Sequence, residues 1–262
     1  MEGSVQMKKL FDLTGKTAII TGGGRGLGKQ IAFALAEAGA RVVLCSRKLD
    51  ACQAASEELQ KMGRQALALA CDVTQPADIE HVVKETVTRF GTIDILVNNS
   101  GISWVAPALE LAADKWDKVM NVNVKAVFLF SQAAAKEMVK SGGGKIINIA
   151  SVTGFGGSPA SFMDTIAYNT SKGAVITFTK DLAVKLAPHN IQVNAIAPGF
   201  FQTKITEGLR GSIYNRMVEQ IPQRRFGSDQ DLKGAAVFLA SGASDYVTGH
   251  ILVVDGGISA QV

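Results

Sequence analysis

Short apolar runs alternate with longer segments of helical periodicity along the whole chain. Seven of these runs have the length and the β-branched content of buried strands; they are residues 17–20, 42–45, 66–70, 93–97, 146–149, 192–196 and 251–254. Continuous apolar strands occur where both faces of a sheet are covered, because neither face then has to meet water. The pattern therefore predicts a parallel β-sheet.

The segments between the runs have the ends expected of helices. The first places Ile31, Leu35 and Ala38 on one stripe and stops at Gly39, and residues 76–90 begin with proline and are followed by Gly91. Strand–helix–strand repeats with short links imply right-handed crossovers. The sequence thus predicts one doubly wound α/β domain over residues 1–262, with seven parallel strands and helices on both faces.

One predicted helix is apolar almost all round. In residues 168–187, apolar side chains occupy most of the circumference, so that one face must contact something besides the sheet. We expect this face to pack against another subunit.

Composition and charge exclude several classes of protein. Of the 262 residues 47% are hydrophobic and 19% are charged, and the net charge of +4 comes without any run of five like charges, so that neither disorder nor a nucleic-acid interface is indicated. The odd number of cysteines, the lack of a signal-peptide core in residues 1–10 and the lack of a membrane-length apolar run favour a cytoplasmic protein. The three histidines show no ligand spacing, and no metal site is expected.

A glycine-rich turn lies between the first strand and the first helix. Gly22, Gly26 and Gly28 stand in the order G-x-x-x-G-x-G. Backbone N–H groups and a helix N-terminus in this context can hold a pyrophosphate, and glycine lets the phosphates approach the backbone. Flexible loops also accumulate glycine, but the position between strand and helix favours nucleotide binding.

The end of the second strand carries basic residues where an acidic one would bind a free ribose 2′-hydroxyl. The chain has Ser46, Arg47 and Lys48 there. Arg47 and Arg25 can offer bidentate donors to a 2′-phosphate, which favours NADP over NAD. The alternative is that Arg47 is a solvated surface residue.

Two further positions carry candidate acid–base chemistry. Tyr168 and Lys172 are at i and i+4, hence on one face of a helix, and a neighbouring ammonium is expected to lower the pKa of the phenol. Ser151 follows a predicted strand, at the edge of the sheet where ligands of open α/β proteins bind, and its hydroxyl can donate to a carbonyl oxygen. The alternative for Ser151 is a turn cap.

Together these motifs resemble the short-chain dehydrogenase/reductase superfamily, from Leu13 to Ser259. The resemblance rests on T-G-x-x-x-G-x-G at residues 21–28, Asp72-Val73, N-N-S-G at residues 98–101, Asn123, Ser151, Tyr168 with Lys172, and Pro198-Gly199 with Thr203. It implies a Rossmann fold and an enzyme that reduces carbonyl groups with NADP(H).

The resemblance also implies a role for each matching residue. Tyr168 would be the general acid, Lys172 would hold the nicotinamide ribose, Ser151 would polarise the carbonyl, and Asn123 would position a relay water. The residues implied to bind the cofactor are Gly22, Arg25, Gly26, Leu27, Gly28, Ser46, Arg47, Asp72, Val73, Asn98, Gly101, Tyr168, Lys172, Pro198, Gly199 and Thr203.

The chain departs from the family pattern in two places. Ser100 replaces the usual alanine of N-N-A-G, which adds a hydroxyl beside the cofactor bed. Ser151 and Tyr168 are separated by a longer interval than in most relatives, and the extra residues fall in the loop 154–164 next to the substrate. Because this longer loop borders the substrate, the resemblance does not fix the identity of the substrate.

The candidate substrate pocket is mostly apolar. It comprises Ser103, Trp104, Phe155, Phe162, Phe200 and Phe201, with a lid at about residues 200–226. This composition favours a hydrophobic ketone or an acyl chain over a sugar. The family resemblance leans towards reductases of 3-oxoacyl thioesters of coenzyme A or of an acyl-carrier protein, and a gluconate 5-dehydrogenase-like activity is the alternative. A non-catalytic NADP-binding sensor or scaffold is disfavoured because all four catalytic positions are filled. The family resemblance implies a homotetramer.

Overall fold

A single parallel sheet of seven strands runs through the computed structural model, which describes residues 7–160, 162–202 and 212–261. The strands are β1 (Thr17–Thr21), β2 (Arg41–Ser46), β3 (Ala66–Ala70), β4 (Ile95–Asn98), β5 (Gly144–Ile149), β6 (Ile191–Pro198) and β7 (Ile251–Val254). All seven predicted strands are present, with ends within two residues of the expected ones, and the predicted fold class is confirmed.

The strand order creates a crevice near the middle of the sheet. The order is β3-β2-β1-β4-β5-β6-β7, so the chain builds outward from β1 in one direction and then returns to build in the other. At this switch point the connections after β1 and after β4 leave toward opposite faces. Ligands of doubly wound sheets bind at such a point, outside the carboxyl ends of the strands.

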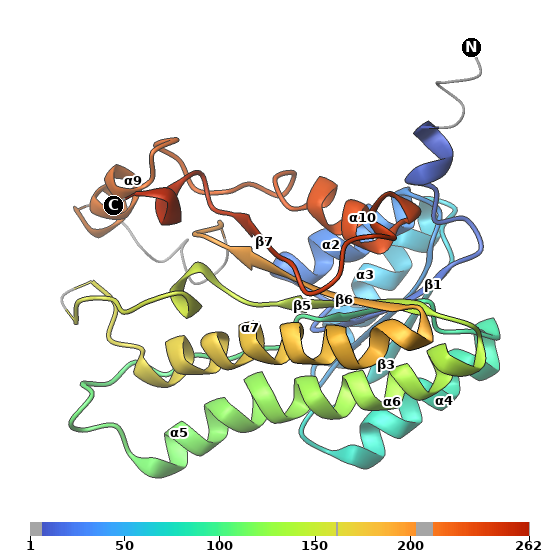
Figure 1. Ribbon diagram of the computed structural model, residues 1–262, viewed down its shortest axis with the longest axis horizontal. Helices are drawn as coiled ribbons and strands as arrows, with labels where there is room; N and C mark the ends of the chain where they lie inside the picture. Colours follow the sequence, from blue (N-terminus) through green and yellow to red (C-terminus); the bar gives the residue numbers. More distant parts are fainter. Residues whose placement is uncertain (1–6, 161, 203–211, 262) are drawn as a thin grey trace.

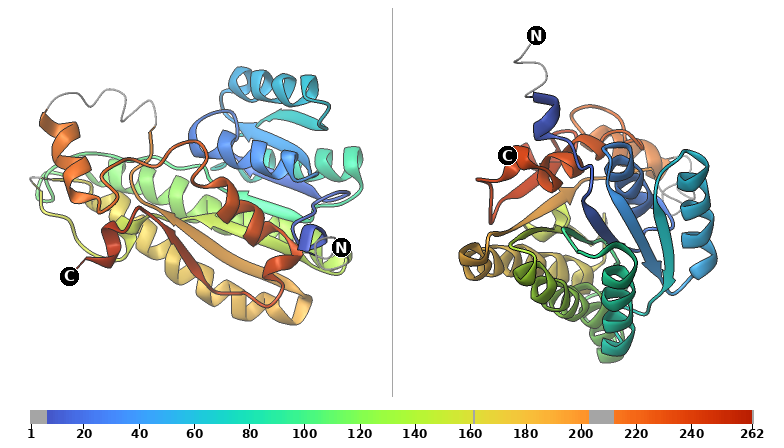
Figure 2. Two further views of the ribbon diagram at one scale, coloured as in Figure 1. Left: turned by 90° about the horizontal axis from the view of Figure 1, so that it is seen from above. Right: turned by 90° about the vertical axis from the view of Figure 1, so that its right-hand side faces the viewer.

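Helices cover both faces of the sheet (Figure 1). One face carries α2 (Gly26–Glu37), α3 (Leu49–Lys61) and α10 (Lys233–Ala240); the other carries α4 (Pro76–Phe90), α5 (Ala113–Met120), α6 (Ala126–Lys140) and α7 (Ile166–Leu186). The views in Figure 2 show the same division, with α6 and α7 side by side. A shorter helix, α9 (Ser212–Gln220), lies beyond the carboxyl end of β6.

Two apolar cores hold these layers together. Ile31 and Leu35 of α2 pack with Leu44 of β2 on one side, and Phe130 and Met138 of α6 pack in the cluster on the other side. All five side chains are fully buried. Burial of each such side chain contributes about 1.5–3 kcal/mol, which explains why the stripe on α2 predicted the face that meets the sheet.

The helical segment between β4 and β5 contains an irregular turn. Residues Asn121–Lys125 form a π-helical turn, η1, between α5 and α6. Such turns are often found at functional sites because they displace one residue out of the regular helical register. Here the turn contains Asn123.

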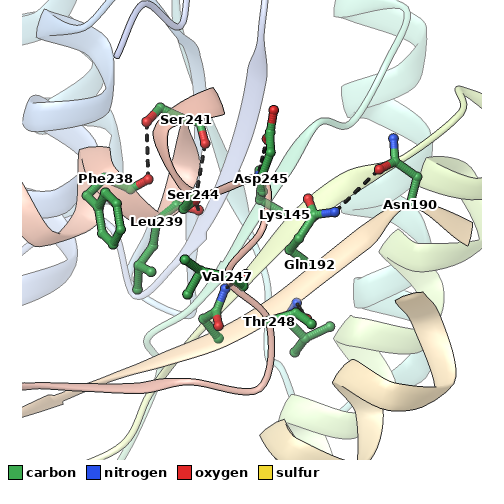
Figure 3. A network of polar contacts seen from close by, with 12 residues as sticks. Lys145, Asn190, Gln192, Phe238, Leu239, Ser241, Ser244, Asp245, Val247 and Thr248 are labelled. Carbon is green, nitrogen blue, oxygen red and sulfur yellow. Dashed lines mark hydrogen bonds and ion pairs between the residues drawn. The ribbon is translucent and has the colours of Figure 1, made fainter. Parts of the chain in front are cut away.

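A polar network ties the edge strand β7 to the rest of the sheet near the amino ends of β5 and β6 (Figure 3). The buried Lys145 of β5 forms an ion pair of 2.7 Å with Asp245, and the Asn194 amide donates to the Val247 carbonyl and accepts from the His250 N–H at 2.8 and 2.9 Å. These bonds fix the loop that leads into β7.

Within the part of the chain that the structure describes, no helix has the length and apolar character needed to span a membrane.

Candidate active site

The glycine turn is tied directly to the loop that follows β4. The Thr21 hydroxyl accepts the backbone N–H groups of Asn99 and Ser100 at 2.9 Å, and the Asn99 amide donates to the Thr21 carbonyl at 2.9 Å. A Cβ on Gly28 would lie 2.4 Å from the Asn99 Nδ2 and from the Gly22 carbonyl. Glycine is therefore required where the turn enters α2, and Asn99 holds the turn although no sequence argument singled it out.

The cradle formed by this turn suits a pyrophosphate. Gly22 and Gly26 have φ angles of 66° and 52°, which favour glycine, and no atom of the described residues lies within 4 Å of the position of a Cβ on Gly26. Arg25 is exposed immediately before α2, and Leu27 packs its partly buried side chain against the core. The residues present thus fit a dinucleotide: the backbone is open on the side of the helix N-terminus and closed on the side of Asn99.

Basic and acidic side chains meet at the ends of β2 and β3. Burial raises the pKa of the Asp72 carboxyl, but hydrogen bonds from Thr74 and the charge of Arg47 outweigh it and lower this pKa overall. Arg47 is exposed, Ser46 accepts the Lys48 N–H at 3.2 Å, and Val73 is buried. The predicted adenosine-binding positions after these two strands are therefore brought together.

Two of the predicted cofactor positions have their contacts inside the sheet. The Asn98 side chain is buried and donates to Ser131 and Asn148 at 2.9 Å, so its amide is used in the interior. Gly199, which directly follows Pro198, donates its N–H to the Val254 carbonyl, and a Cβ on Gly199 would lie 2.7 Å from the Asp255 Cβ. Thr203 lies outside the described residues.

The four candidate catalytic residues converge opposite Gly101. A Cβ on Gly101 would lie 3.5 Å from the Asn123 Oδ1 and 3.7 Å from the Lys172 Nζ. Lys172 is 5% exposed; its Nζ donates to the Ile149 carbonyl at 2.6 Å and lies 5.5 Å from the centroid of the Tyr168 ring. Residues from β4, η1 and α7 thus meet at one point of the crevice.

Burial dominates the ionisation of the tyrosine–lysine pair. It raises the pKa of the Tyr168 phenol, against a smaller lowering by a hydrogen bond with Ser151, and it lowers the pKa of the Lys172 ammonium to about 8. The expected lowering of the phenol pKa by Lys172 is therefore not found. Its reason is that the ammonium is directed to the Ile149 carbonyl and that burial penalises the phenolate.

Ser151 is a turn cap, which is one of the two roles that its sequence position left open, and its role toward a carbonyl oxygen stays a prediction. Its hydroxyl accepts from the Thr153 N–H at 3.2 Å and from the Thr153 hydroxyl at 3.0 Å, which caps the short 3-10 turn η2 (Val152–Gly154). Ser151 is also close enough to the Tyr168 phenol to lower its pKa. Capping holds the serine beside the tyrosine.

Asn123 is fixed by its side chain, and Ser171 is the partner that sequence reasoning missed. The Asn123 amide accepts the Ile102 N–H at 2.9 Å and donates to the Ile102 carbonyl at 2.8 Å and to the Ser171 hydroxyl at 2.9 Å. Ser171 in turn donates to the Tyr168 carbonyl at 2.7 Å. The sequence feature that could have indicated this partner is that Ser171 is a polar residue one position before Lys172, on the inner side of α7.

The aromatic residues predicted to line the substrate pocket are exposed or pack on one another. Trp104 and Phe155 are 38% and 50% exposed, Ser103 is exposed beside them, and Phe162 makes an edge-to-face contact with Phe200 at 5.9 Å between ring centroids.

Phe201 does not belong with these pocket residues. It is 5% exposed, and its ring packs against Gly227 and within the core on the side of α2 and α10. The prediction that it lines the substrate pocket is wrong, because successive residues after β6 point to opposite faces.

Among the described residues, no three histidine, cysteine, aspartate or glutamate side chains are grouped so that they could hold a metal ion.

A pyrophosphate cradle beside a buried phenol and ammonium supplies what hydride transfer to a carbonyl needs from a protein, namely alignment of a nucleotide cofactor and a proton source. The fold and the site therefore define a dinucleotide-dependent oxidoreductase. Comparison with known proteins narrows this class. A family model described as enoyl-(acyl carrier protein) reductase matches residues 22–259, and the chain belongs to the short-chain dehydrogenase/reductase family, as the sequence motifs indicated.

Relatives that are named for different substrates match almost the whole chain. A 2-dehydro-3-deoxy-D-gluconate 5-dehydrogenase of Dickeya dadantii is 44% identical over 96% of this chain and 98% of its own length. A 3-oxoacyl-[acyl-carrier-protein] reductase of Staphylococcus epidermidis is 36% identical over 93% and 98%. The solved structure of a gluconate 5-dehydrogenase from Burkholderia cenocepacia in complex with NADP and tartrate has a TM-score of 0.92, 38% identity, and coverage of 98% and 100%.

Proposed function

We propose that this protein reduces a ketone to a secondary alcohol with NADPH, and that the ketone is a 3-oxoacyl thioester. The observation that carries the reaction class is the convergence of Ser151, Tyr168 and Lys172 on the crevice opposite Gly101. When bound, NADPH supplies the hydride that reaches the carbonyl carbon.

The protein's own groups then supply the proton and hold the carbonyl. Tyr168 donates its phenolic proton to the carbonyl oxygen, and the Ser151 hydroxyl stabilises the charge that develops there. The raised pKa of Tyr168 keeps the phenol protonated at neutral pH, which suits proton donation. Lys172 holds a positive charge near the resulting phenolate, and Asn123, fixed by Ile102 and Ser171, keeps the lysine's side of the crevice open to a water relay.

Replacement of Tyr168 by phenylalanine tests this assignment against a non-catalytic NADP-binding protein. We expect the Y168F protein to bind NADPH within about twofold of wild type, measured by fluorescence of the bound cofactor, and to lose about 10²-fold or more of the reductase rate. If wild type and variant are equally inactive over a panel of ketones, the protein is a binding module.

The preference for NADP rests on the basic residues at the adenosine end. Arg25 and Arg47 are both exposed, in the turns after β1 and β2, and Arg47 and Lys48 between β2 and α3 are both basic. The Burkholderia relative with TM-score 0.92 is in complex with NADP. We expect R47D to weaken NADPH binding by about tenfold or more and to leave NADH binding within about threefold, measured by fluorescence titration. Equal losses for the two cofactors would contradict the assignment.

The apolar rim of the crevice favours an acyl chain. Trp104, Val105, Leu109 and Phe155 are each at least 38% exposed. Exposed apolar side chains at a crevice fit a hydrophobic substrate better than a polyol.

A keto-sugar acid is the second candidate, because the Dickeya relative at 44% identity is named for such a substrate. NADPH consumption with acetoacetyl-CoA and with 5-ketogluconate, at equal concentrations, distinguishes the two. Faster turnover of acetoacetyl-CoA supports the thioester as substrate. Turnover of 5-ketogluconate alone shows that the substrate is a keto-sugar acid and that the thioester proposal is wrong. Activity with acetoacetyl-acyl-carrier protein then tests the carrier as a partner.

We also propose a homotetramer formed through α6 and α7. Phe128 of α6 is 44% exposed and lies edge-to-face on Phe178 of α7, and Val184 of α7 is 75% exposed. These positions make the apolar circumference of α7 continuous with α6. Light scattering at micromolar concentration should give four times the chain mass of 27.6 kDa; a monomer contradicts the proposal. The lid at residues 200–226 is described only in part, and its role stays a prediction.

A further inference from the structure

A row of buried polar side chains crosses the sheet directly beneath the catalytic crevice. It consists of Ser131 of α6, Asn98 of β4, Asn148 of β5 and Thr179 of α7, which are all at most 4% exposed. Asn98 and Asn148 are paired positions of adjacent strands. The row therefore links the two central strands to the two helices that lie below them.

Every link in this row is a short hydrogen bond with a defined direction. The Asn98 amide donates to the Ser131 hydroxyl and to the Asn148 Oδ1 at 2.9 Å. The Asn148 Nδ2 donates to the Thr179 hydroxyl at 3.0 Å, and that hydroxyl donates to the Val175 carbonyl at 2.7 Å. A buried polar network with satisfied partners rigidifies its surroundings, because any shift leaves a desolvated group unpaired.

The same strand and helix meet again at the catalytic lysine. Asn148 directly precedes Ile149, whose carbonyl accepts the Lys172 ammonium at 2.6 Å. Thr179 follows Lys172 by seven residues, which is two turns and about 10 Å along the same side of α7. Two polar contacts therefore join α7 to β5, one at the ammonium and one at Thr179.

Apolar packing by itself leaves the position of α7 weakly defined. The helix is apolar around most of its circumference, and apolar contacts are non-directional. Among the described residues, the side-chain hydrogen bonds from α7 to strands of the sheet are those of Lys172 and Thr179. The bond at Thr179 is thus the directional contact with a strand of the sheet that does not itself involve the lysine, whereas the bond of Ser171 runs to Asn123 of η1.

We propose that Asn148 and Thr179 are positioning residues for Lys172: their hydrogen bond sets the depth and rotation of α7 on β5, so that the ammonium reaches the Ile149 carbonyl and faces the crevice. The inference rests on the proposed role of Lys172 in the reduction. It assigns to this pair a part in the reaction, beyond a contribution to stability.

Thr179→Val is the main test, since valine has nearly the shape of threonine and lacks the hydroxyl. Thr86→Val is the matched control: Thr86 of α4 is equally buried, and its hydroxyl also donates four residues back, to the Val82 carbonyl at 2.7 Å. Among the residues that the structure describes, Thr86 makes no side-chain hydrogen bond to the sheet. Thr179→Ser restores the hydroxyl, and Thr179→Cys serves as a milder change if T179V does not fold. Lys172→Ala measures the role of the lysine itself.

All variants are assayed with whichever ketone wild type reduces faster, acetoacetyl-CoA or 5-ketogluconate, over pH 6–10. We expect T179V to lower kcat about fivefold or more, with NADPH Kd and substrate KM within about twofold, and T179S and T86V to stay within about twofold of wild type. Because burial lowers the pKa of Lys172, entry of water on displacement of α7 should move the alkaline limb of the T179V profile to higher pH.

The result that overturns the inference is wild-type kcat and an unchanged pH profile in T179V, or in T179C where T179V does not fold. A loss in T86V equal to that in T179V, or failure of T179S to restore kcat, also overturns it, since either result shows a general effect of the substitution. If K172A retains wild-type kcat, the proposed role of Lys172 is wrong, which is separate from a failure at Thr179.

Discussion

Replacement of Lys172 by methionine should reveal the energetic cost of keeping this ammonium inside the protein. Lys172 is 5% exposed, and burial lowers its pKa from 10.5 to about 8. Methionine fills a similar volume without a charge. The comparison of the two proteins isolates the ionisation of one side chain, because every other titrating group is present in both.

The sign of the effect follows from the proton bound in each state. Below pH 8 the lysine is charged in both the folded and the unfolded protein. Between pH 8 and 10.5 the folded state has released the proton and the unfolded state still holds it, so the stability of wild type relative to K172M rises with pH. At about 1.4 kcal/mol per pH unit, the relative gain is about 2 kcal/mol between pH 7.5 and 9.5 and about 3 kcal/mol in full.

Urea unfolding of both proteins at pH 7.5, 8.5 and 9.5, followed by tryptophan fluorescence, measures this difference. Trp104 and Trp116 supply the signal. The free energy of unfolding of wild type minus that of K172M should increase along the series. A difference that is flat, or that falls as the pH rises, would refute the assignment of a buried, charged lysine.

Two further substitutions test the scaffold around the site. Gly28→Ala should abolish NADPH binding in a fluorescence titration, since its Cβ would lie 2.4 Å from backbone and side-chain atoms of the turn and of Asn99. Gly156→Ala is the control and should bind NADPH normally, because no described atom lies within 4 Å of its Cβ position. NADPH binding by both variants would contradict the proposal that the glycine turn holds the cofactor. Asp245→Asn should lower the free energy of unfolding by about 1 kcal/mol, because it leaves the buried Lys145 without its carboxylate. Asp181→Asn removes a carboxylate from an exposed ion pair and should change the free energy of unfolding by less than about 0.5 kcal/mol. Equal losses for the two variants in urea unfolding would show that burial of Lys145 does not strengthen its ion pair.

Local patterns in the sequence were sufficient for the architecture. Each strand was visible as a short apolar run, and α4 begins and ends at the residues that Pro76 and Gly91 indicated. These helix ends depend on the local backbone alone, because proline has a fixed φ that suits the first turn of a helix and Gly91 adopts the left-handed conformation that ends it, with φ 84°. The irregular turn at Asn121–Lys125 was not predicted from the sequence.

The site was predictable as a set of residues but not as a set of contacts. Tyr168 and Lys172 share a helix face by spacing, yet the direction of the ammonium depends on the Ile149 carbonyl of another element. Asn98 was expected at the cofactor, and its amide is used within the sheet. Phe201 looked like a pocket residue because it is aromatic and follows a strand, and the alternation of side chains buries it.

The sequence by itself determined the order of strands and helices, the glycine turn and the residue types available for chemistry, because these follow from local propensity, periodicity and spacing. The tertiary structure decided which of those residues face the crevice, which partners hold them, and how burial shifts the pKa values of Tyr168 and Lys172. The physical reason is that hydrogen bonds and desolvation depend on atoms brought together from β4, β5, η1 and α7, and no window along the chain contains them all.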